Sequence, residues 1–89
     1  SADFLDELDE LGYGDLPLAD YVRMRDHGVT PEYVEALREQ GYRNLTSNEL
    51  VKLRDHGVTA SYVRRAKELF RSTPTVEQLI RLRSSGDLR

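Results

Sequence analysis

The hexapeptide RDHGVT occurs twice in this chain of 89 residues, at residues 25–30 and again at residues 54–59. The flanking residues keep the same spacing of 29 residues, and a degraded third copy occupies residues 79–86. Self-similarity at a fixed period of roughly 20 to 50 residues is typical of stacked structural repeats. We therefore predict a single repeat domain over residues 1–89, with a half-repeat at 1–16, repeats at 17–45 and 46–74, and a degraded half-repeat at 75–89.

Each predicted helix stop has the same form, a glycine followed by an apolar residue. The stops are Gly12-Tyr13, Gly28-Val29, Gly41-Tyr42 and Gly57-Val58. Glycine adopts the left-handed conformation of a Schellman stop, and the residue after it packs on the side chain four positions before the glycine. All of those side chains are apolar, namely Leu8, Met24, Leu37 and Leu53.

Threonine residues mark most of the predicted helix starts. Thr30 and Thr59 are predicted N-caps, whereas Thr46 with Glu49 and Thr75 with Gln78 predict capping boxes. Pro17 stands at the corresponding position of the first unit, so we expect a less sharply defined start there. The result is an all-α fold of about six short helices in a helix-turn-helix repeat of 29 residues, at about 3–11, 18–27, 31–40, 47–56, 60–71 and 76–85.

Helices of this length are not stable in isolation, so they must pack together. The short turns predict contact between consecutive helices. The pattern fits either a small α-solenoid or a compact helical bundle and does not choose between them.

Composition excludes several classes of site. The chain has no cysteine, and therefore neither a disulfide framework nor a thiolate metal site. No apolar run has the length of a membrane span, so we predict no membrane insertion. The start at Ser1, without an initiator methionine, suggests a processed protein or a piece of a longer one, and the sequence leaves the cellular compartment open.

The net charge of −3 hides an asymmetry. Residues 1–45 contain 11 acidic and 4 basic side chains, whereas residues 46–89 contain 5 acidic and 9 basic ones. An asymmetry of this kind influences how the two halves meet their partners, including other copies of the chain. We therefore predict a protein partner or self-association, in which the acidic N-terminal helix of one copy meets the basic C-terminal half of another.

The only two histidines, His27 and His56, occupy equivalent positions. A metal site would need further ligands, for which Asp26 and Asp55 are the nearest candidates. Each histidine, however, directly precedes a glycine stop, where its ring can cap the last helical carbonyls. We predict capping, with no metal and no cofactor. The sequence also lacks a cysteine nucleophile and a glycine-rich phosphate loop, so we expect no enzyme.

A basic pair recurs in the first helix of every unit. Stacking is predicted to align these residues as a basic stripe able to bind carboxylates or phosphates, made of Arg23, Arg25, Lys52, Arg54, Arg81 and Arg83. The alternative explanation is that basic residues near helix C-termini are favoured by the helix dipole and remain solvated.

The segment 53–66 resembles a DNA-binding helix-turn-helix, with Gly57-Val58-Thr59 as its turn. The resemblance implies a reading helix that carries Arg64, Arg65 and Lys67. The segment departs from that family at Leu53, where the family normally has a small residue. The equivalent helix of the first copy, residues 31–40, carries three glutamates that a phosphate backbone would repel.

A second resemblance covers residues 13–70. The string His27-Gly-Val-Thr-Pro-Glu-Tyr-Val34, with Leu37-Arg38 and Gly41-Tyr42-Arg43-Asn44-Leu45 after it, is similar to short helical repeats found in tandem in some bacterial proteins. They occur in C-terminal extensions of penicillinase-antirepressor-type membrane metallopeptidases and in envelope-associated proteins. Because the zinc motif of the peptidase is absent, the resemblance implies an accessory module that binds or associates, without catalytic residues.

These observations favour a non-enzymatic helical-repeat module for protein–protein association, including self-association. The alternative is a DNA-binding helix-turn-helix domain that uses the helix at 60–71.

Overall fold

The structure, a computed structural model, describes residues 2–88. These residues form α1 (Ala2–Glu10), α2 (Leu18–Asp26), α3 (Pro31–Glu39), α4 (Ser47–Asp55), α5 (Ala60–Phe70) and α6 (Val76–Ser85). The prediction of an all-α fold is confirmed, and each helix begins and ends within one residue of its predicted bounds.

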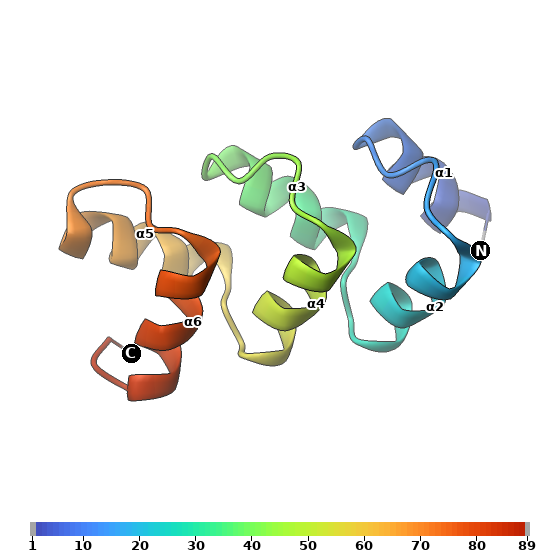
Figure 1. The fold of residues 1–89 in the computed structure, drawn as a ribbon. Helices are drawn as coiled ribbons and strands as arrows, with labels where there is room; N and C mark the ends of the chain where they lie inside the picture. The colour runs from blue at the N-terminus through green and yellow to red at the C-terminus, as the bar shows by residue number, and fades with distance from the viewer. Residues whose placement is uncertain (1, 89) are drawn as a thin grey trace.

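The helices are arranged in two rows (Figure 1). One row contains α1, α3 and α5, the other contains α2, α4 and α6, and neighbours within a row are in contact. The array measures 39 × 20 × 16 Å, with the N- and C-termini at opposite ends. Each turn carries the chain into the other row, so the main backbone contacts join helices one repeat apart. Consecutive helices also touch through side chains, because Arg54 of α4 lies over Tyr33 of α3 and Arg83 of α6 lies over Tyr62 of α5.

The predicted Schellman stops are confirmed at all four positions. The glycines have φ between +71° and +101°. The N–H of the residue after each glycine donates to the carbonyl of the predicted partner, at 2.8 Å for Tyr13 to Leu8 and for Val29 to Met24, and at 3.0 Å for Tyr42 to Leu37 and for Val58 to Leu53. The four partner side chains are buried in one continuous core cluster.

The helix starts also agree with the sequence. Thr30, Thr46, Thr59 and Thr75 each accept a hydrogen bond from the backbone N–H three residues later, and both capping boxes are present. Pro17 gives α2 no side-chain cap. The hydroxyl of Tyr21 strengthens this start instead, because it accepts from the N–H of Leu16 and donates to the carbonyl of Tyr13.

Candidate interaction surfaces

Successive units are joined by tyrosine hydroxyls. Tyr13 donates to the carbonyl of Leu45 at 2.6 Å, and its copy Tyr42 donates to the carbonyl of Pro74 at 2.5 Å. Each bond spans 32 residues, slightly more than one repeat. Burial raises the pKa of Tyr42 to about 12 and also raises that of Tyr13. These hydroxyls therefore stay protonated as donors in the joints between units.

A second tyrosine joint involves α3. Tyr33 donates to the carbonyl of Val58 at 2.6 Å. Burial raises the pKa of Tyr33 to about 12, although the nearby guanidinium of Arg54 acts in the opposite direction. That guanidinium lies 4.9 Å from the centre of the Tyr33 ring, within the range of a cation–π contact.

Basic side chains of the α1–α3–α5 row reach back to the preceding unit. Arg38 donates to the carbonyl of Leu11 at 2.8 Å, and its copy Lys67 donates to the carbonyl of Gln40 at 3.0 Å. Both acceptors are carbonyls at a helix C-terminus, where the backbone has no partner of its own. The recurrence of a basic residue 29 residues apart was the sequence signal for this contact.

His27 and His56 occupy the C-cap positions of α2 and α4, as the sequence predicts, and their backbone N–H groups bond to the last turn. Their rings, however, contact the next unit, whereas the sequence predicted bonds to the last helical carbonyls. Nδ1 of His27 lies 2.8 Å from Oδ1 of Asp55 in the next unit. At the equivalent place, Nδ1 of His56 lies 3.4 Å from the hydroxyl of Ser84. Among residues 2–88, no three histidine and carboxylate side chains converge as a metal ion would require.

The predicted basic stripe separates into two sets. Arg54 and Arg83 lie over the rings of Tyr33 and Tyr62 in the opposite row, at 4.9 and 5.4 Å. They also pack beside Gly28 and Gly57, where an added Cβ would lie 3.4 and 3.7 Å from the guanidinium nitrogens. Arg25, the first member of this set, is exposed. Arg54 and Arg83, although exposed, therefore contribute to the joints between units.

The second set faces the grooves of the α2–α4–α6 row. Arg23 is half-buried, whereas Lys52 and Arg81 are exposed. Lys52 and Arg81 line the same groove between α4 and α6. Lys52 and Arg81 therefore lie together on an accessible part of this row.

The basic residues of α5, on which the DNA-binding alternative depends, are partly engaged within the molecule. Lys67 donates to the carbonyl of Gln40, and the guanidinium of Arg65 lies 5.5 Å from the centre of the Tyr62 ring. Arg64 is exposed. Tyr62, Val63 and Ala66 form the buried side of the same helix.

Apolar side chains are exposed on the outer side of α1 and α2. Leu5 is 42% exposed, whereas Val34, at the equivalent position of α3, is 2% exposed. Val22 is 42% exposed, whereas its copy Val51 is 4% exposed beside α2. Leu18 is 73% exposed. We call this surface the leading face, and define it by Leu5, Leu18, Ala19, Val22 and Asp26.

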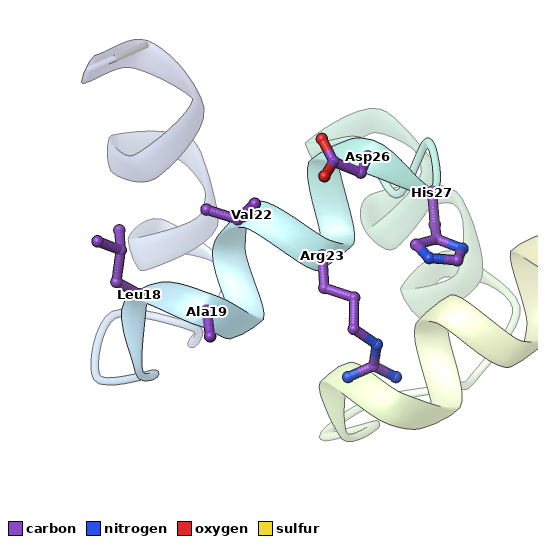
Figure 2. A pocket seen from close by; sticks show the side chains of 6 residues that line it. All are labelled: Leu18, Ala19, Val22, Arg23, Asp26 and His27. Carbon is purple, nitrogen blue, oxygen red and sulfur yellow. The ribbon is translucent and has the colours of Figure 1, made fainter.

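Part of the leading face is a shallow depression on α2 (Figure 2). In the figure Leu18 and Val22 point away from α4, whereas Arg23 extends toward it. The depression is lined by Leu18, Ala19, Val22, Arg23, Asp26 and His27.

The opposite side of the array, formed by α5 and α6, also exposes apolar side chains. Leu69 is 58% exposed and Phe70 is 40% exposed. A second depression runs from Phe70 across α6 past Arg81 and Leu82. We call this surface the trailing face, and define it by Arg65, Leu69, Phe70, Arg81 and Leu82.

Within residues 2–88, no helix combines the length and apolar character that crossing a bilayer requires. Comparisons with protein-family models, with curated proteins and with solved structures gave no match, so the resemblance to bacterial tandem repeats stays a prediction.

Proposed function

We propose that this chain is a non-enzymatic helical-repeat module that associates with proteins through the outer faces of its two rows. The observation that carries the proposal is the contrast at the leading face. Leu5 and Val22 are each 42% exposed at positions where their copies Val34 and Val51 are buried in the core. A surface shaped to receive a helix, and apolar at its centre, is typical of a protein contact.

The tyrosines support a structural role rather than a catalytic one. Tyr13, Tyr33 and Tyr42 have raised pKa values because they are buried, and each donates its hydroxyl proton to a backbone carbonyl of the next unit. These three pKa shifts follow from the joints of the array, so they do not by themselves indicate an active site.

Site-specific photocrosslinking in the cell tests the proposal. Benzoylphenylalanine at Val22 is expected to give a protein adduct at several times the yield obtained at Arg43, an exposed control position in the turn between α3 and α4. Introducing Leu18→Lys should remove the Val22 adduct, because it places a charge in the apolar contact. Leu18 is mostly exposed, so the substitution should leave the fold intact. Equal yields at Val22 and Arg43, or an adduct indifferent to Leu18→Lys, would contradict the proposal.

DNA binding through α5 has less support. Lys67 is held by the carbonyl of Gln40, and Arg65 lies against Tyr62, so Arg64 is the one predicted reading residue that is exposed without either engagement. A mobility-shift assay at about 50 mM salt tests this alternative, because nonspecific phosphate contacts are already strong there. A shift lost on Arg64→Ala would favour it.

A further inference from the structure

The groove between α4 and α6 shows which side chains of one helix lie opposite those of the next helix in this row. On the α4 side, the groove is lined by Lys52, and on the α6 side by several side chains. The α6 residues are Glu77, Ile80, Arg81 and Ser84. Two repeats, or 58 residues, earlier in the chain, the equivalent residues are Ala19, Val22, Arg23 and Asp26. All of them line the depression on the outer side of α2 (Figure 2).

The outer side of α2 therefore matches the α6 side of the groove between α4 and α6. To complete an equivalent groove, α2 needs a second helix that carries a basic residue equivalent to Lys52 of α4. One repeat further along the chain, that position is Arg81 on the outer side of α6. An α6 helix placed against α2 would bring Arg81 beside Val22 and Asp26, where its aliphatic stem can cover the valine and its guanidinium can pair with the carboxylate. The same register brings Arg81 near Arg23, just as Lys52 shares a groove with Arg81 inside the array, so the carboxylate of Asp26 would lie between two basic side chains.

The α1–α3–α5 row gives an independent argument from charge. The groove between α1 and α3 places Glu7 and Glu10 near Glu32 and Glu35, an arrangement of like charges. Placing α5 of one copy against α1 of another puts Arg65 at the position of Glu7 and Glu68 at the position of Glu10. In the same arrangement, Asp3 and Asp6 of α1 take the positions of Glu32 and Glu35. The contact between copies would therefore replace one of the two like-charged residues of α1 with an opposite charge, Arg65, while Glu68 keeps the charge of Glu10.

We propose that the trailing face of one copy docks on the leading face of a second copy, with α6 against α2 and α5 against α1, so that both rows continue across the junction. The inference rests on the proposed function and names its partner. Because the two faces differ, each assembly keeps one free leading face and one free trailing face after every docking step, so the contact is heterologous and the assembly grows into open chains or closes into rings.

One feature weakens the junction relative to the internal joints. Asp9 occupies the position of Arg38 and Lys67, which donate to carbonyls of the preceding unit. A carboxylate cannot donate this bond, so the contact between copies lacks it. We therefore expect reversible assembly through a contact weaker than the internal joints, and a dependence on salt because the charged pairs are exposed.

Sedimentation of the 89-residue chain tests the proposal, from about 10 µM to about 1 mM protein at low salt. The average mass should rise past that of a dimer. Val22→Lys opposes Arg81 across the junction, and Leu69→Asp opposes the acids of α1. Each variant alone should remain monomeric, whereas an equimolar mixture should form a dimer and nothing larger, because one intact face remains on each. Arg43→Asp, in an exposed turn, is the control expected to assemble like the parent chain.

The outcomes separate this inference from the proposed function. If Leu69→Asp alone forms a dimer, the contact joins two leading faces and the head-to-tail arrangement is overturned. A parent chain that is monomeric at about 1 mM overturns self-association at any useful affinity. In that case, a Val22 crosslink to a different protein in the cell would leave the proposed function in place, whereas the absence of any crosslink would remove both.

Discussion

Tyr33 and Tyr62 occupy the same position in successive units, yet only one of their hydroxyls has a partner. The hydroxyl of Tyr33 donates to the carbonyl of Val58, whereas the oxygen of Tyr62 is buried and has no partner among residues 2–88. The position 25 residues after Tyr62, equivalent to Val58, is Asp87. Val58 is buried and its N–H donates to Leu53, whereas Asp87 is exposed and its N–H meets the hydroxyl of Ser85.

The comparison shows that a joint between units depends on the apolar residue that follows the glycine. Gly57 and Gly86 both adopt positive φ, so the backbone turns in the same sense at both stops. Only Val58, however, folds back onto the core and carries its carbonyl to the tyrosine. Burying an apolar side chain is favourable by roughly 1.5–3 kcal/mol, whereas an aspartate at that position would lose its hydration.

The largest difference in the free energy of unfolding is expected for the side chains that lie under the stops at Gly57 and Gly86. Leu53 is fully buried, whereas its copy Leu82 is half-buried. Leu53→Ala should lower the free energy of unfolding by about 3 kcal/mol, because it leaves a cavity under the Schellman stop. Leu82→Ala should cost about 1 kcal/mol, since solvent already reaches that side chain. Urea unfolding of both variants measures the difference, and equal losses would show that the two stops are packed alike.

Removing the hydroxyl of Tyr33 or of Tyr62 should give the next largest difference in the free energy of unfolding. Tyr33→Phe should cost about 1–2 kcal/mol, because it removes a buried hydrogen bond and leaves the carbonyl of Val58 without its donor. Tyr62→Phe should be neutral or slightly stabilising, since it deletes a buried hydroxyl that has no partner. The same urea titrations measure both values. A cost for Tyr62→Phe as large as that for Tyr33→Phe would mean that its hydroxyl has a partner in solution.

The sequence alone predicted the features that depend on residues close together in the chain, namely the helix stops and the helix caps. A glycine, the apolar residue after it and the side chain four positions before lie within one turn, so their pattern alone specifies the stop. The same holds for Thr46 with Glu49, which close a capping box over four residues. Helix bounds followed from these signals to within one residue.

The contacts between units could not be predicted in this way. They depend on the rotation from one unit to the next, which no local pattern specifies and which decides that helices one repeat apart become neighbours. His27 therefore meets Asp55, although its sequence position alone favoured a cap. Likewise, the sequence predicted Arg54 as part of a basic stripe, and only the structure shows that its guanidinium lies over Tyr33. The recurrence of Tyr13 as Tyr42 was a usable signal, but it did not name the acceptor.

Restoring the missing valine should make the last joint resemble the one before it. Asp87→Val is expected to raise the free energy of unfolding by about 1 kcal/mol, because the new side chain can pack behind Gly86. In that background Tyr62→Phe should become costly, since the carbonyl of residue 87 would now reach the hydroxyl. A double-mutant cycle measures this coupling. If Asp87→Val stabilises without any coupling to Tyr62, burial of the valine does not move the carbonyl into place.

The smallest expected effect concerns the histidine contacts of the same two joints. His27 and Asp55 lie 2.8 Å apart but are both largely exposed, so their interaction should contribute only about 0.2–1 kcal/mol in a cycle built from His27→Gln and Asp55→Asn. His56 and Ser84, at 3.4 Å, make a weaker and uncharged contact, and a cycle on His56→Gln and Ser84→Ala should give a value close to zero. In a buffer acidic enough to protonate His27, adding salt should reduce the first coupling and leave the second unchanged, because only the first then joins two opposite charges. Two equal couplings would show that the histidine contact is the same in both joints. The difference between the joints would then come from Val58, which is buried, whereas Asp87 is exposed.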